Sequence, residues 1–121
     1  MSTSAFASPI ERFLPLSPQV FQVLLSLHDE PRHGYAVIQD VRLRTADEMK
    51  LTASTLYDAL ARLSEQGLIA TSESPAEETD ARRRYYRITD LGRAVTAAEA
   101  RRLQRLIDSA RAKRVIGEPR R

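Results

Sequence analysis

Apolar and polar positions in the first half of the chain fall into blocks that proline, serine and glycine delimit. Ser8 to Glu11 has a capping-box spacing and predicts a short helix that ends at Pro15. Ser17-Pro18 repeats the start signal ahead of a nearly all-round apolar helix, which must be central and which Pro31 ends. A second helix is predicted from Gly34 to about Arg44. Its expected buried face consists of Tyr35, Val37, Ile38 and Val41.

The third helical stretch has a clear start, a clear end and two different faces. A polar link over residues 45–50 precedes it, Thr52 is a good N-cap, and the helix is predicted through Gln66 with Gly67 as C-cap. The apolar stripe consists of Leu56, Ala59, Leu60 and Leu63. The opposite face carries Ser54, Asp58, Ala61, Arg62 and Glu65.

The pattern then changes to that of a hairpin followed by a long helix. Residues 68–73 and 81–88 predict two strands that a polar turn at about 74–81 joins. Because a lone hairpin is marginal in water, it must pack on the helices, and Tyr86 and Ile88 are the expected packing residues. Thr89 or Asp90 caps a last helix that is predicted to continue to about Ile116. Gly117 and Pro119 are expected to stop it.

Three helices, a two-stranded hairpin and a fourth helix follow the plan of a winged helix-turn-helix. The expected fold class is therefore mainly α (α+β), a winged helix-turn-helix with a long C-terminal dimerisation helix. The expected parts are an N-terminal arm with a short helix (1–16), the winged DNA-binding domain (17–89), the C-terminal helix (90–116) and a tail (117–121).

Composition narrows the class of protein. A chain of 121 residues without cysteine predicts one domain, no disulfide and no thiolate metal site, and no apolar run reaches membrane-spanning length. The start does not resemble a signal peptide, so a cytoplasmic protein is expected. The net charge of +3 is the sum of −1 over residues 1–50, −2 over 51–90 and +6 over 91–121. Basicity therefore belongs to the C-terminal region, and an argument for DNA binding must rest on local placement.

Five motifs in the order and spacing of one family cover about residues 18–95, and together they resemble the PadR family of transcriptional regulators. They are His33-Gly34-Tyr35, Leu51–Tyr57, Leu60–Ile69, Arg84–Thr89 and Leu91-Gly92-Arg93. The resemblance implies a homodimeric regulator of double-stranded DNA, usually a repressor, whose C-terminal helix forms the dimer. The chain departs from the family at Asp58, where proline is common after the tyrosine.

The proposed recognition helix starts with small polar residues that can approach phosphates or base edges. The expected DNA contacts are Lys50, Thr52, Ser54, Thr55, Tyr57 and Arg62. Alternatives stay open for several of them: Thr52 could be only a cap, Tyr57 only the edge of the core, and Arg62 a partner of Asp58 four residues earlier. Asp58 could accept a hydrogen bond from cytosine, or could favour the positive end of the helix dipole.

The arginines of the hairpin, Arg82, Arg83 and Arg84, are expected at the wing tip, where guanidinium groups suit the minor groove or its phosphates. Arg83 and Arg84 are expected to contribute most to affinity. The opposing interpretation is a loop that neutralises itself. It rests on four acidic side chains of the same hairpin, Glu73, Glu77, Glu78 and Asp80.

The last helix carries two apolar stripes about a quarter turn apart. Leu91, Val95 and Ala98 are expected to pack on the chain's own domain. The second stripe is expected to pack on a second copy and consists of Leu103, Leu106, Ile107 and Ala110. Two recognition helices would then read an inverted repeat with half-sites about 34 Å apart. A small-molecule effector at a dimer cavity near Phe21, Leu103 and Leu106 is conceivable, but its identity cannot be read from the sequence.

No cofactor, metal or catalytic site is predicted. Pro31 separates His28 from His33, so the two imidazoles cannot share a helix face. No cysteine, phosphate-binding glycine loop or serine–histidine–acid set is present. Two other interpretations are considered. One is a winged protein-interaction module that binds no DNA, which the net charge of −3 over residues 1–90 favours. The other is membership of another family of ligand-responsive winged-helix regulators.

Overall fold

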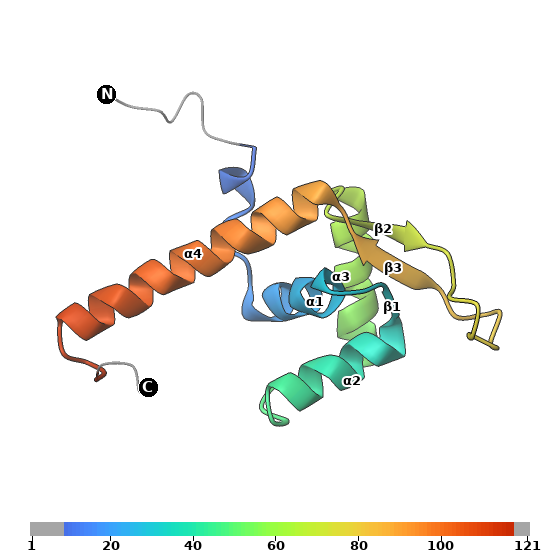
Figure 1. Cartoon of the computed structure of the whole chain (residues 1–121), viewed down its shortest axis with the longest axis horizontal. Coiled ribbons are helices and arrows are strands. Elements are labelled where there is room, and N and C mark those ends of the chain that lie inside the picture. Colours follow the sequence, from blue (N-terminus) through green and yellow to red (C-terminus); the bar gives the residue numbers. More distant parts are fainter. Residues whose placement is uncertain (1–8, 118–121) are drawn as a thin grey trace.

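The computed structural model of the chain describes residues 9–117 and contains helices around a small three-stranded sheet (Figure 1). The elements in chain order are the 3-10 helix η2 (Glu11–Phe13), α1 (Pro18–His28), β1 (Arg32–His33), α2 (Gly34–Arg44), α3 (Ala53–Glu65), β2 (Ile69–Ser72), β3 (Tyr85–Ile88) and α4 (Asp90–Ala112). This arrangement confirms the α+β winged class. Within residues 9–117, no helix combines the length and apolar character that a membrane crossing requires.

The helix starts follow the capping residues that the sequence predicts. The Ser17 hydroxyl accepts from the Val20 amide at 3.1 Å, Thr52 Oγ1 from the Thr55 amide at 3.1 Å, and Thr89 Oγ1 from the Gly92 amide at 3.0 Å. Each bond satisfies one of the amides that a helix start leaves without a partner. Thr89, and not Asp90, is therefore the cap of α4. The caps fix where each helix begins and confirm the predicted starts of α1, α3 and α4.

The sheet has one strand more than the predicted hairpin. In the order β1-β3-β2, β3 is central and pairs antiparallel with both neighbours. On the β1 side Arg32 is opposite Tyr86 and His33 is opposite Tyr85. A strand of two polar residues has no alternation to detect, which is why the sequence pattern did not reveal β1.

Strand β3 starts at Tyr85, so the prediction of a strand that includes Arg82, Arg83 and Arg84 is wrong. These arginines lie in the loop between β2 and β3, where no ladder fixes their direction. Ile88 is buried and Tyr86 is half-buried against the core, which confirms both as packing residues. Tyr85 is buried as well, with 8% of its surface exposed, and the sequence pattern did not predict this.

The core lies where α1, α2 and α3 meet the sheet, with α1 at its centre. Its fully buried members include Val23, Leu24 and Leu27 of α1, Val37 and Val41 of α2, and Leu56, Leu60 and Leu63 of α3. Tyr35 does not belong to it. It is 58% exposed, because its side chain leaves the first turn of α2 on the solvent side. Its assignment to the buried face of α2 was wrong.

Helix α4 ends at Ala112 and not near Ile116. Arg114 adopts a left-handed conformation with φ of 63°, the Val115 amide donates to the Ala110 carbonyl at 2.8 Å, and the Arg114 amide donates to the Arg111 carbonyl at 3.0 Å. This pattern is a Schellman motif, which terminates a helix without help from glycine or proline. Pro119 lies outside the described residues, as does Ser8 at the other end of the chain.

The two halves of α4 have different surroundings (Figure 1). The first half packs on α1 and β3, and Val95, Thr96 and Glu99 are buried there. The second half extends away from the other helices. Of the predicted second stripe, Leu106 and Ile107 are 54% and 41% exposed, whereas Leu103 and Ala110 are half-buried.

Candidate nucleic-acid interface

The first turn of α3 presents hydroxyl groups to solvent, while Leu56 holds the helix in the core. Thr52, Ser54 and Thr55 are exposed, and Leu56 is fully buried. Thr52 Oγ1 accepts from the Thr55 amide and donates to Thr55 Oγ1 at 2.9 Å. Thr52 is therefore a cap, and its exposure also leaves it accessible to a ligand. An exposed helix start with small polar residues is suited to an anionic backbone.

Tyr57, one turn further along α3, lies against the backbone of α2. It is 51% exposed, so it is not a residue of the core. A Cβ atom at Gly34 would come within 2.8 Å of Tyr57 Cζ and still closer to the hydroxyl oxygen. The absent side chain at Gly34 thus makes room for the phenol. The contact places the hydroxyl of Tyr57 beside the start of α2 and leaves part of the ring open to solvent.

One open depression of about 590 Å³ joins this tyrosine to the arginine loop. Its lining residues come from β1, the start of α2, α3, the loop between β2 and β3, and β3 itself: His33, Gly34, Tyr35, Tyr57, Asp80, Arg82, Arg83, Arg84 and Tyr86. Residues more than 20 positions apart in the sequence therefore share one surface. The structure brings four of the predicted contacts together here, namely Tyr57 and the three arginines.

The three loop arginines are not equivalent. Arg82 donates to Asp80 at 3.2 Å, and Arg83 forms ion pairs with Glu78 at 3.4 Å and with Asp80 at 4.0 Å. Arg84 is exposed and has no hydrogen bond or ion pair within residues 9–117. The loop is thus neutralised in part, as the opposing interpretation expected, and Arg84 is the guanidinium that it leaves uncommitted.

Glu78 is the centre of this loop and was not singled out from the sequence. Its side chain is 7% exposed and accepts from the Tyr85 hydroxyl, from the Asp80 amide at 2.9 Å and from Arg83 at 3.4 Å. The hydrogen bond from Tyr85 comes first among the causes that lower its pKa to about 2, followed by the Asp80 amide and Arg83. The carboxylate therefore stays ionised at any physiological pH.

His33 connects the loop to α2. Its Nδ1 accepts from the Ala36 amide at 3.2 Å and so caps α2, and its ring meets the Tyr85 ring edge-on with 5.3 Å between centroids. Burial is the main cause that lowers the pKa of His33, and the nearby Arg83 adds to it. His33 directly precedes the predicted helix start at Gly34, and its role there is that of a cap.

The remaining predicted contacts of this region, Lys50 and Arg62, are both exposed, in the link before α3 and in its last turns. Asp58 is exposed on α3 as well, and no ion pair joins it to Arg62 in the part of the chain that the structure describes. The structure thus leaves Arg62 open to solvent. The contact of each residue with DNA stays a prediction.

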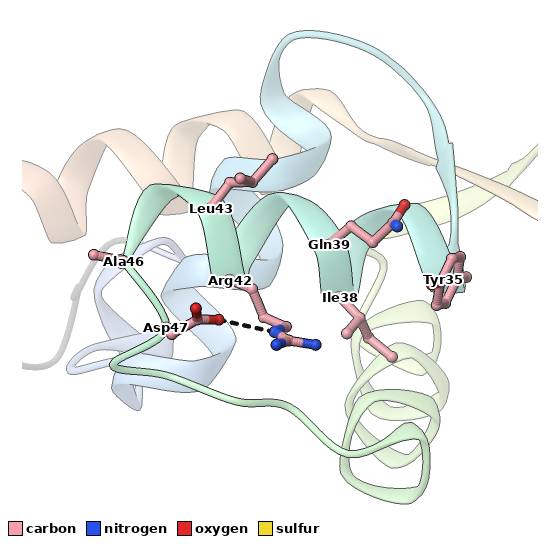
Figure 2. Close-up of a pocket in the computed structure, with 7 residues that line it drawn as sticks. All are labelled: Tyr35, Ile38, Gln39, Arg42, Leu43, Ala46 and Asp47. Atoms are coloured by element: carbon pink, nitrogen blue, oxygen red, sulfur yellow. Dashed lines mark hydrogen bonds and ion pairs between the residues drawn. The ribbon is translucent and has the colours of Figure 1, made fainter.

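A second depression, of about 480 Å³, lies along α2 and shares Tyr35 with the first (Figure 2). Arg42 and Asp47 pair across its floor at 3.0 Å. Its other lining residues are Ile38, Gln39, Leu43 and Ala46. Between residues 9 and 117 no group of three or more acidic, histidine or cysteine side chains could hold a metal ion. The effector cavity expected near Phe21, Leu103 and Leu106 stays a prediction.

Comparison with known proteins identifies the family. The chain is 31% identical over 72 residues to an uncharacterised protein of Lysinibacillus sphaericus, and these residues are 60% of this chain and 65% of that protein. It is similar to a transcriptional regulator from Clostridium thermocellum (27% identity, TM-score 0.63, 81% of this chain and 96% of that chain). It is also similar to a PadR family transcriptional regulator from Eggerthella lenta DSM 2243 (29% identity, TM-score 0.63, 83% of each chain).

The family model described as "Transcriptional regulator PadR-like family" matches residues 23–98. The matched stretch contains α2, α3 and the sheet, together with residues 23–28 of α1 and residues 90–98 of α4. It therefore includes every element that lines the first depression. Members of this family are regulators of transcription and not enzymes, and the chain belongs to the PadR-like family of transcriptional regulators.

Proposed function

We propose that the protein is a cytoplasmic, homodimeric repressor that binds an inverted-repeat operator in double-stranded DNA. The observation that carries this proposal is the shared depression of Tyr57 and the three loop arginines. A recognition helix and a wing have to meet the same duplex, so their DNA-contacting side chains need to lie on one surface. The exposed hydroxyls of Thr52, Ser54 and Thr55 extend that surface to the start of α3.

The two elements have different tasks in this proposal. The first turn of α3 enters the major groove, where hydroxyl groups reach base edges and phosphates. The wing approaches the flanking phosphates or the minor groove with guanidinium groups, which are permanently charged and flat. Lys50 and Arg62 contribute phosphate contacts that position the domain without reading sequence.

Dimerisation sets the spacing of the two recognition helices. The stripe of Leu103, Leu106, Ile107 and Ala110 supports a partner chain on the second half of α4, because Leu106 and Ile107 are exposed beside the half-buried Leu103 and Ala110, and neighbouring exposed apolar side chains favour burial. A twofold dimer places its recognition helices about 34 Å apart, which is one turn of DNA. A small-molecule effector that changes this separation would lower the affinity for the operator without touching the DNA surface.

Fluorescence anisotropy tests the proposal with a labelled duplex from the promoter of the protein's own gene and a random duplex of the same length. We expect nanomolar to micromolar binding to the first duplex and much weaker binding to the second. Replacing Ser54 and Thr55 by alanine should remove most of this preference. Ser64→Ala, an exposed serine near the other end of α3, is the matched control and should leave binding unchanged.

A protein-interaction module is the second candidate function. The ion pairs of Arg82 and Arg83 with Asp80 and Glu78 favour it, because a neutralised wing attracts DNA less strongly. The same titration separates the two functions. Equally feeble binding to both duplexes would exclude sequence-specific DNA recognition and support the interaction module.

A further inference from the structure

A carboxylate at the centre of a proposed DNA-binding wing is unexpected on electrostatic grounds, since it repels phosphate. Glu78 is nevertheless nearly buried, at 7% exposure, and three donors from the loop and from β3 converge on it. Glu73 and Glu77, on the same loop, are exposed, and their carboxylates have no hydrogen bond or ion pair within residues 9–117. Glu78 therefore differs from the other glutamates of the wing, and its contacts indicate a specific task.

The contacts of Glu78 tie the loop to the rigid part of the domain. Tyr85, which donates its hydroxyl to Glu78, is the first residue of β3, is buried, and pairs with His33 of β1. His33 in turn caps α2 and packs edge-on against Tyr85. A continuous set of contacts therefore connects the loop, the sheet and the start of α2, next to which Tyr57 lies.

The contacts of this loop distinguish its three arginines, because two of them are paired with acidic side chains and one is not. Glu78 and Asp80 hold Arg83, and Asp80 holds Arg82 through both its main-chain amide and its side chain. Arg84 follows directly and lines the depression beside Tyr57 with no partner in the described chain. With its neighbours held, the backbone at Arg84 has little freedom, which lowers the entropy lost when its guanidinium binds.

We propose that Glu78 is a positioning residue for DNA binding, and that it fixes the wing so that Arg84 is the guanidinium that contacts phosphate. The inference rests on the proposed DNA-binding function. It predicts that removal of the Glu78 carboxylate weakens DNA binding. Electrostatics alone predicts the opposite, because removal of a negative charge from the wing reduces its repulsion of phosphate. The competing possibility is that Glu78 inhibits binding by occupying Arg83, in which case its removal strengthens binding.

The experiment uses the full chain and compares Glu78→Ala with Glu77→Ala, which removes the same charge from an exposed site of the same loop. Affinity for the promoter duplex is measured from 50 to 300 mM salt. We expect Glu78→Ala to weaken binding about tenfold and to reduce the salt slope by about one unit, because one phosphate contact is lost. Glu77→Ala should bind equally well or more tightly.

A double variant distinguishes loss of a shared phosphate contact from simple destabilisation, because two changes that remove the same contact are not additive in the salt slope. Arg84→Ala should reduce the salt slope by about one unit, and the double variant with Glu78→Ala should show no further reduction, because both changes remove the same contact. Glu78→Gln, which can still accept from Tyr85 and Asp80, should recover part of the affinity. Should Glu78→Ala fail to fold by circular dichroism, Tyr85→Phe removes one hydroxyl from the same set and should give the weaker binding and the lower slope.

The outcomes separate the failure of this inference from that of the proposed function. A wild-type protein that does not distinguish promoter from random duplex would refute the proposed function itself. Normal wild-type binding together with tighter binding by Glu78→Ala would overturn the positioning role. An additive double variant, or an unchanged slope in Arg84→Ala, would overturn the assignment of the phosphate contact to Arg84.

Discussion

The two halves of α4 belong to one continuous helix but differ in what covers them. In the first half Val95 is fully buried and Glu99 is 1% exposed, whereas in the second half Leu106 and Ile107 are 54% and 41% exposed. Both halves carry apolar residues at helical spacing, so periodicity alone does not distinguish them. The difference lies in their surroundings: the second half extends away from the other helices, so nothing in the described chain covers Leu106 and Ile107 (Figure 1). The comparison shows that apolar residues at helical spacing do not by themselves indicate burial within the same domain.

The glycines near the two ends of α4 offer the strongest test of this difference. A Cβ atom at Gly92 would collide with the carbonyl of Leu68, which is backbone and cannot rotate away, and would lie 2.7 Å from Ile88 Cγ1. Gly92→Ala should therefore cost about 3 kcal/mol of stability or prevent folding. At Gly117 no atom of residues 9–117 lies within 4 Å of the added atom, so Gly117→Ala should be silent. Urea denaturation of both variants measures the difference, and equal stabilities would contradict the packing described for the first half.

A charge on the second stripe tests whether it has a partner. Leu106→Glu should weaken self-association at least a hundredfold, which corresponds to about 2.7 kcal/mol, because a carboxylate would be buried between two helices. The stability of the single domain should change by less than about 0.5 kcal/mol, since Leu106 is exposed within its own chain. Sedimentation velocity measures the association. Arg105→Glu, at the neighbouring exposed position outside the stripe, is the control, and an equal loss of association in both variants would count against this interface.

Acid titration tests the packing of the first half. Arg102 donates two hydrogen bonds to the buried Glu99, at 2.7 and 2.8 Å, and these are the main cause that lowers the pKa of Glu99. A carboxyl with a lowered pKa in the folded state stabilises the protein above its ordinary value of 4.5 and ceases to do so as the pH falls through the folded value. Wild-type stability should therefore fall below about pH 4.5, and Glu99→Gln should fall less steeply. Melting temperatures at pH 7 and pH 4 measure this, and parallel curves would contradict it.

The smallest expected effect concerns His33, outside α4. Its pKa is lowered by burial and by Arg83 against the opposing influence of Glu78 and Asp80, so the neutral ring is favoured in the folded state. Its contribution is present above the ordinary pKa of 6.5 and is lost as the pH falls through the folded value. His33→Asn keeps a capping acceptor without titrating, so it should abolish this small loss of stability between pH 7 and pH 5. Wild type and variant with identical pH profiles would show that His33 does not contribute.

The sequence was sufficient to predict the helical framework, because each helix carries its own start signal. The predicted bounds of α2 match the structure, and Ser17 and Thr52 cap the helices where their types and positions indicated. Gly67 adopts the left-handed conformation, with φ of 78°, that ends α3. These features depend on neighbouring residues alone, and local patterns are what a single sequence displays.

Features that depend on long-range contacts were not accessible in the same way. Strand β1 exists because β3 pairs with it, and Glu78 is held because Tyr85, seven residues later, returns to it. Composition placed Glu78 among four equivalent acids, and only the folded loop distinguishes it. The end of α4 was misplaced for a different reason: a left-handed arginine is uncommon, whereas Gly117 suggested a familiar stop. The DNA contacts themselves remain predictions.

The contact between Gly34 and Tyr57 has a consequence for how such a domain can vary. Because any side chain at position 34 would meet the phenol, a larger residue there requires the Tyr57 ring to move or position 57 to become smaller. Substitution at position 34 is therefore conditional on position 57, although 23 positions separate them along the chain. Since Tyr57 also lies on the proposed DNA surface, a new binding preference that requires a different residue at 57 would open a space above α2 that a side chain at 34 could fill.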